Sequence, residues 1–172
     1  MNFARVIHVS AFLAVSVWCT AIVVAPLLAA GDGLQQAVSD ALYFFFGKVC
    51  HQIDSRSFHL EGYPLAVCSR CFGIYAGFCA GAILLALKGF RLMILPAPSI
   101  VLTALTPMVI DVAGATLGLY EPTNSLRLLT GFWFGAVMPF CLVPLLREAV
   151  MQWVERLNTA TFVPILKNTF RD

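Results

Sequence analysis

The stretch VIHVSAFLAVSVWCTAIVVAPLLAAG, residues 6–31, contains no aspartate, glutamate, lysine or arginine. A helix needs about 17–25 mostly apolar residues to cross the hydrocarbon core of a bilayer. Three later stretches, 71–87, 92–110 and 128–146, are also free of these charges, and the second of them continues past a single acid, Asp111. The sequence therefore predicts four membrane-spanning helices, which we place at about residues 6–30, 70–88, 92–118 and 128–146.

The composition of the whole chain agrees with this prediction. Soluble domains average about 45–50% apolar and about 25% charged residues, whereas this chain of 172 residues is 60% hydrophobic and only 12% charged. These values exclude a soluble enzyme, a disordered chain and a fibrous repeat. The net charge of +2 is too small to indicate a nucleic-acid partner. We expect one membrane domain, 1–172, folded as an all-α bundle in a lipid bilayer.

Two segments outside the spans have the pattern of amphipathic helices. In 34–49, the apolar residues that recur at helical spacing are Leu34, Val38, Leu42, Phe45 and Val49. In 148–158, they are Val150, Trp153, Val154 and Leu157. We expect both segments to lie at the membrane interface. For 34–49, a re-entrant or spanning segment remains an alternative.

Glycines recur at four-residue spacing in three of the spans, where they allow close helix packing. They are Gly73, Gly77 and Gly81, then Gly114 and Gly118, then Gly131 and Gly135. The pattern predicts a compact bundle, and it also offers glycine-rich faces to membrane-protein partners.

Lysine and arginine indicate the orientation, because cytoplasmic loops carry an excess of them. With the N-terminus inside, the cytoplasmic residues are Arg5, Lys88, Arg91, Arg147, Arg156, Lys167 and Arg171. Those on the other side are Lys48, Arg56, Arg70 and Arg127. This bias predicts a multi-pass protein of the cell (inner) membrane, with both termini cytoplasmic and the loop 48–71 outside.

The outer loop 48–71 concentrates cysteine and histidine. Cys68 and Cys71 form a Cys-x-x-Cys pair, and Cys50 is followed by His51. With His51 or His59 as the fourth ligand, the three cysteines form a candidate tetrahedral site for zinc or iron. A redox dithiol or disulfide, and inert thiols, remain the alternatives.

Charged residues near the same side form a second candidate cluster. An acid inside a span costs about 2.5–3.5 kcal/mol on insertion scales, so we expect Asp111 to face Arg127 or Arg70 and not lipid. Guanidinium groups suit phosphate and carboxylate, although these arginines could also simply reach the headgroup level. We assign catalytic roles to Asp111, Cys50 and His51. The predicted ligand-binding residues are Arg56, Arg70, Tyr75, Asn124 and Arg127.

Several of these residues stand in recognisable strings. Cys50-His51-Gln52, Cys68-Ser69-Arg70-Cys71 and the segment 121–131 resemble the family of small predicted membrane proteins called domain of unknown function 2085. The resemblance extends from about Lys48 to Gly135, and the family pattern tends to have glycine where this chain has Val112. It implies that these residues belong together and implies no reaction.

The favoured function is a site at the outer leaflet, organised by a metal or thiol centre, that acts on an anionic lipid-like or quinone-like ligand. An accessory subunit of a larger membrane complex is the second hypothesis, and a small transporter is the third. Internal repeats at the binding site are typical of transporters, and we find none in the sequence.

Overall fold

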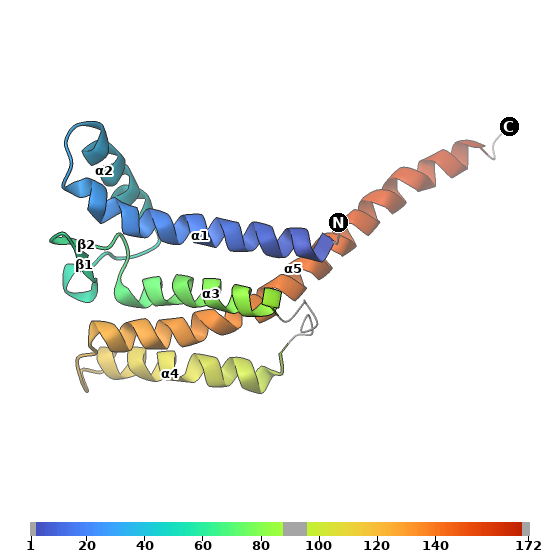
Figure 1. The fold of residues 1–172 in the computed structure, drawn as a ribbon. Coiled ribbons are helices and arrows are strands. Elements are labelled where there is room, and N and C mark those ends of the chain that lie inside the picture. The colour runs from blue at the N-terminus through green and yellow to red at the C-terminus, as the bar shows by residue number, and fades with distance from the viewer. Residues whose placement is uncertain (1–2, 88–95, 170–172) are drawn as a thin grey trace.

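The computed structural model describes residues 3–87 and 96–169, with side chains described for 5–87 and 96–156. Helices dominate this part of the chain, which confirms the predicted all-α class (Figure 1). The elements in order are α1 (Phe3–Ala29), α2 (Leu34–Phe46), the 3-10 turn η1 (Asp54–Arg56), β1 (His59–Leu60), β2 (Tyr63–Pro64), α3 (Ser69–Leu87), α4 (Pro98–Thr116) and α5 (Asn124–Thr169).

Four of the helices are long and apolar enough to cross a membrane, as predicted: Arg5–Ala29, Ser69–Leu87, Pro98–Thr116 and Asn124–Arg156. The third begins at Pro98, because proline fits the first turn of a helix, where no backbone donor is needed. Its predicted start at residue 92 lies outside the described residues. The fourth begins before the predicted residue 128, since Thr123 Oγ1 accepts the N–H of Leu126 at 3.2 Å and caps the helix.

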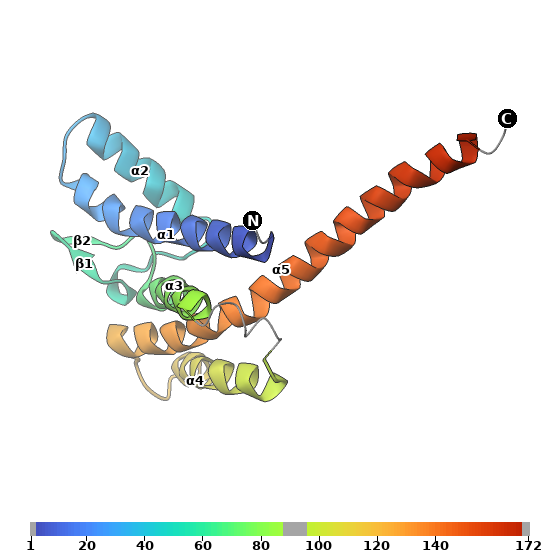
Figure 2. The same ribbon diagram turned by 45° about the vertical axis from the view of Figure 1, so that its right-hand side comes forward.

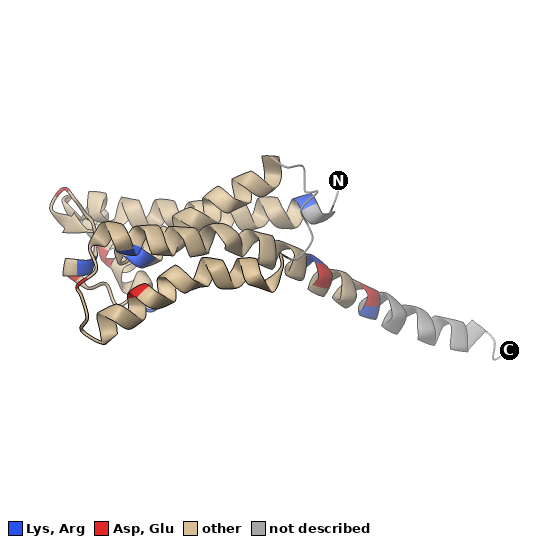
Figure 3. Cartoon of the chain, turned by 90° about the horizontal axis from the view of Figure 1, so that it is seen from below, with Lys and Arg blue, Asp and Glu red and all other residues tan. Residues whose placement is uncertain are grey.

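Successive spanning helices run in opposite directions, so each has one end at either end of the bundle (Figures 1 and 2). The hairpin β1–β2 and α2 lie at one end, with the starts of α3 and α5, and we call it the loop end. The N-terminus lies at the opposite end. Figure 3 shows the bundle almost free of charged residues between these ends. This distribution matches a helical bundle set in lipid.

Helix α2 folds back along α1 and is the helix predicted in 34–49, although it ends at Phe46, before Val49. Ser39, which is buried, donates its hydroxyl hydrogen to the Ala25 carbonyl of α1 at 2.8 Å. On the outer side of α2, Leu34 and Phe44 are 80% and 70% exposed. With 13 residues, α2 is too short to span a bilayer. Its placement at the membrane interface stays a prediction.

The C-terminal segment differs from the prediction. Residues 148–158, expected as a separate surface helix, are a continuation of α5, which runs from Asn124 to Thr169 without a break. No glycine or proline follows the span until Pro164, and residues 147–152 are mostly good helix formers. The second half of α5 therefore extends away from the bundle (Figure 1).

Glycines bring α3 and α5 into backbone contact. A Cβ added at Gly77 would lie 2.2 Å from the Phe132 carbonyl oxygen, and one at Gly135 would lie 2.1 Å from that of Ile74. The same holds for Gly73, Gly81 and Gly131. The glycine-rich faces of α3 and α5, which the sequence also offered to membrane-protein partners, cover each other within the chain. The bundle is compact here for the reason that the spacing predicted.

Gly77→Ala is expected to destabilise the protein by about 1–3 kcal/mol, because the added methyl group must push α3 and α5 apart. The measurement is thermal unfolding of the purified protein in detergent. Ala86→Val also enlarges α3, at an exposed position, and serves as the control with little expected change. Equal unfolding temperatures for Gly77→Ala and the wild type would contradict this packing.

Candidate functional site

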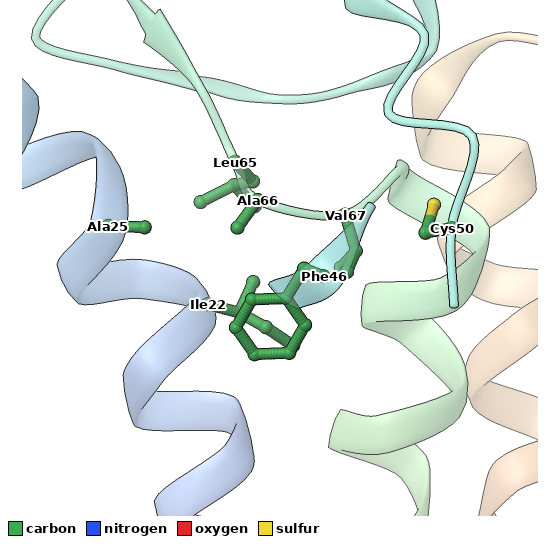
Figure 4. Packing of buried hydrophobic residues seen from close by; sticks show 7 residues of the cluster. All are labelled: Ile22, Ala25, Phe46, Cys50, Leu65, Ala66 and Val67. Atoms are coloured by element: carbon green, nitrogen blue, oxygen red, sulfur yellow. The ribbon is translucent and has the colours of Figure 1, made fainter. Parts of the chain in front are cut away.

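A buried apolar cluster at the loop end holds Cys50 in place. Ile22 and Ala25 of α1 and Phe46 of α2 pack with Leu65, Ala66 and Val67, and Cys50 lies at one side of them (Figure 4). Trp18 packs edge-on against Phe46 and Tyr75. Its ring centroid lies 5.1 Å from that of Phe46 and 5.7 Å from that of Tyr75. The loop that carries Cys50 is therefore anchored on α1 and α2.

Gln52 ties this loop to the segment that precedes α3. It has a left-handed backbone (φ 48°), and its side-chain amide donates to the carbonyls of Tyr43 and Ala66, both at 2.8 Å. The Tyr43 hydroxyl donates in turn to the Pro64 carbonyl. These bonds align the turn after Cys50 with the chain that leads to Cys68.

Cys50, Cys68 and Cys71 are brought together as predicted, with their sulfur atoms all within 4.8 Å of one another. Cys50 is 7% exposed, and its sulfur accepts the backbone N–H of Cys68 at 3.2 Å. Hydrogen bonds from the thiols of Cys68 and Cys71 lower the pKa of Cys50 well below its usual value, against the opposing effect of burial. The cluster therefore favours a thiolate at Cys50, and all six cysteines are free thiols.

The cysteine cluster has the donor set of a metal centre. Tetrahedral zinc–thiolate bonds of about 2.3 Å place sulfur atoms about 3.8 Å apart, which the observed grouping accommodates. Thiolates suit zinc and iron, whereas magnesium and calcium prefer oxygen. Cys71 lies in the first turn of α3, at the end of the helix that adjoins the loop carrying Cys50.

Neither predicted histidine joins the three sulfur atoms. Among the residues with described side chains, the group within 4.8 Å contains the cysteines alone. His59 Nε2 lies 3.0 Å from Asp54 Oδ1, on the exposed surface of the loop. His51 is exposed and lies on the wall of a pocket that the three cysteines also line. The two cysteines of a Cys-x-x-Cys pair lie close together because one turn of the chain connects them. The direction of the His51 side chain depends instead on the conformation of the loop around Gln52.

Asp111 is buried, as predicted, and pairs with Arg70 across the bundle. Its residue exposure is 2%, and its Oδ2 accepts a hydrogen bond from Arg70 Nη2. Its Oδ1 accepts the hydroxyl hydrogen of Tyr120 at 2.8 Å. Of the two partners considered from the sequence, Arg70 and Arg127, the first is therefore confirmed. The carboxylate has a cationic donor on one oxygen and a neutral donor on the other.

Tyr120 was not among the residues selected from the sequence. Gly118 adopts φ 69° and turns the chain after α4. Gly114 leaves room for the ring, since a Cβ there would lie 2.4 Å from Tyr120 Cε1. Gly114 of α4 thus accommodates an aromatic ring and not a neighbouring helix, and Gly118 turns the chain beyond the end of α4. These two glycines were the signal in the sequence.

Asn124, at the start of α5, connects the loop 48–71 to Arg127. Its side-chain amide donates to the Ser57 carbonyl at 3.1 Å. Its Oδ1 accepts a hydrogen bond from Arg127 Nη1 at 3.2 Å. Asn124 therefore orients Arg127 and fastens the loop, without lining the pocket itself.

A single pocket of about 360 Å³ joins the cysteines to the arginines. Its polar wall consists of Cys50, Cys68, Cys71, His51, Arg56, Arg70 and Arg127. Its apolar wall consists of Val49, Ile53, Ile74 and Met108. Tyr75, also predicted as a ligand-binding residue, packs on Trp18 instead. The structure thus gathers most of the predicted site residues around one space.

Comparison with known proteins agrees with this grouping. The family model described as "Predicted membrane protein (DUF2085)" matches residues 50–141, a region that starts at Cys50 and includes Arg127. The chain belongs to the DUF2085 family. The resemblance stated from the sequence motifs is therefore confirmed, and the family description itself names no activity.

Two archaeal proteins are similar to this DUF2085 chain. An uncharacterized protein of Methanocaldococcus jannaschii is 37% identical over 114 residues, which cover 66% of this chain and 73% of the relative. An uncharacterized protein of Methanothermobacter thermautotrophicus is 36% identical over 89 residues, covering 50% and 77% respectively. No solved structure matches the chain.

Proposed function

We propose that this membrane protein binds zinc or iron through Cys50, Cys68 and Cys71, and binds an anionic amphiphile in the adjoining pocket. The observation that carries the proposal is that all three cysteines and three arginines line the same space. A set of three cysteine ligands leaves one position of a tetrahedral ion to a further ligand, as in zinc sites that accept water or substrate. Because the three cysteines line the pocket, a ligand bound in it would lie beside the ion.

The pocket suits a ligand with an acidic head group and an apolar body. Arg56, Arg70 and Arg127 supply guanidinium donors, which match phosphate and carboxylate oxygens. Asp111 offsets the charge of Arg70 only. Ile74 and Met108 form an apolar part of the wall. A lipid-like molecule with a phosphate head group combines both properties.

The residues earlier assigned catalytic roles take specific places in this proposal. Cys50 is a metal ligand, and His51 is a polar group on the pocket wall beside it. Asp111 acts through Arg70, because both of its carboxylate oxygens are already hydrogen-bonded. The proposal therefore concerns binding, and it specifies no reaction.

We propose further that the loop end faces the outside of the cell membrane, with both termini in the cytoplasm. The excess of lysine and arginine on the side of the N-terminus supports this orientation. The arginines of the loop end have a role in the pocket, which accounts for their presence on the side that is poorer in such residues.

The test is binding of short-chain phosphatidic acid by the purified, metal-loaded protein in detergent. At about 100 times its Kd, a ligand stabilises the native state by about 2.7 kcal/mol, so we expect a clear rise in unfolding temperature. Phosphatidylcholine of the same chain length is expected to give a much smaller rise. Arg127→Gln should weaken the response to phosphatidic acid.

Arg147→Gln is the matched control, because Arg147 is exposed on α5 and lies outside the pocket. It should respond to phosphatidic acid like the wild type. Equal responses to the two lipids, or a full response in Arg127→Gln, would contradict an arginine-based anion site.

A further inference from the structure

Arg70 has a donor that the protein leaves unpaired. One end of its guanidinium group, Nη2, donates to Asp111. Its Nε is buried and has no hydrogen-bond partner among the residues that the structure describes. A buried unpaired donor is costly, and native proteins rarely leave one without a partner. Arg70 lines the pocket, so a bound ligand can reach the guanidinium group from that space, although Nε itself is closed off from it.

The direction of Arg70 depends on how Asp111 is held. The side chain of Asp111 is 3% exposed, and that of Arg70 is 22% exposed. Tyr120 donates to Asp111 Oδ1 at 2.8 Å, opposite the oxygen that receives Arg70. With both oxygens engaged, rotation of the carboxylate would break a hydrogen bond. The guanidinium group of Arg70 is then held through Nη2 by a carboxylate that is itself fixed.

Tyr120 remains a donor over a wide pH range. Its hydrogen bond to the Asp111 carboxylate raises the pKa of the Tyr120 hydroxyl above its usual value. The ring is held in the space left by Gly114, after the turn at Gly118. The hydroxyl is therefore delivered to the carboxylate by the fold of the α4–α5 connection.

We propose that Tyr120 and Asp111 are positioning residues, which together orient Arg70 so that it binds the acidic head group of a ligand in the pocket. This inference rests on the proposed function, because it presupposes that the pocket binds an anion. It adds that head-group affinity is controlled by a hydroxyl that lines no part of the pocket.

Tyr120→Phe tests the inference, because it removes the hydroxyl and keeps the ring. The measurement is the Kd for short-chain phosphatidic acid, by isothermal titration calorimetry of the metal-loaded protein in detergent. We expect about five- to tenfold weaker binding, as for the partial loss of one charge-assisted hydrogen bond. The metal content should stay unchanged.

Tyr63→Phe is the matched control. It also removes a tyrosine hydroxyl at the loop end, from a residue of β2 that is 40% exposed and does not line the pocket. It should leave the Kd for phosphatidic acid unchanged even where it lowers the unfolding temperature. Equal weakening by both variants would mean general loosening of the site and would overturn the inference.

Arg70→Lys supplies a second readout, since lysine keeps the positive charge beside Asp111 but lacks the planar fork. In that background, Tyr120→Phe should cause no further loss of affinity. An unchanged Kd in Tyr120→Phe alone, or full additivity with Arg70→Lys, would overturn the inference. If the wild type binds phosphatidic acid no better than phosphatidylcholine, the proposed function fails instead.

Discussion

Cys50→Ser, Cys68→Ser and Cys71→Ser are each expected to reduce bound zinc or iron from about one ion per chain to less than about a tenth of that value. Each change replaces one of three sulfur donors, whose atoms lie within 4.8 Å of one another, by a poor ligand of similar size. The remaining pair cannot fill a tetrahedral site. The measurement is elemental analysis of protein purified in detergent and freed of unbound metal.

Two variants serve as controls for this loss. Cys141→Ser removes a free thiol of α5 that lies outside the cysteine cluster, so its metal content should equal that of the wild type. His51→Ala should also retain the ion, because His51 does not belong to the group of sulfur atoms. Metal content that is unchanged in Cys68→Ser, or lost in Cys141→Ser, would contradict the assignment of ligands.

Asp111→Asn and Arg70→Gln are expected to lower the free energy of unfolding by about 3–5 kcal/mol each. Either change leaves the partner as an uncompensated charge inside the bundle, where Asp111 is 2% exposed. The double variant should recover part of the loss, since neither charge then remains buried alone. Thermal and denaturant unfolding in detergent measures all three variants.

Arg127→Gln is the internal comparison for this ion pair. Arg127 contacts Asn124 and not Asp111, so its loss should cost much less stability than that of Arg70. If Arg127→Gln destabilised the protein as much as Arg70→Gln, or if Asp111→Asn were neutral, the structural role of the pair would be wrong.

The spans could be predicted from the sequence because lipid excludes charged side chains over a fixed thickness. Cys68 and Cys71 could be grouped because they lie one helical turn apart at the start of α3, where the Phe72 N–H donates to the Cys68 carbonyl. The burial of Asp111 followed from the cost of a charge in lipid. The pairing of Asp111 with Arg70 and not with Arg127 could not be predicted, since both arginines lie near the start of a helix at the loop end.

Tyr120 and His51 show where the sequence carries too little information. The Tyr120 hydroxyl reaches Asp111 only because Gly118 turns the chain at φ 69°, and a glycine in a span reads equally as a packing residue. His51 sits next to a cysteine ligand in the chain, yet Gln52 adopts φ 48° and its amide is bonded to two distant carbonyls. Such loop geometry leaves no periodic pattern in the sequence from which it could be predicted.

X-ray absorption at the metal edge of the wild-type protein tests the cysteine metal centre directly, because it counts the atoms bound to the ion. We expect three sulfur neighbours at about 2.3 Å if the ion is zinc, with one lighter atom in the remaining position. Cys68→Ser should lose this sulfur shell together with the metal. A fully loaded wild-type protein whose ion is surrounded by oxygen and nitrogen alone would contradict a cysteine metal centre.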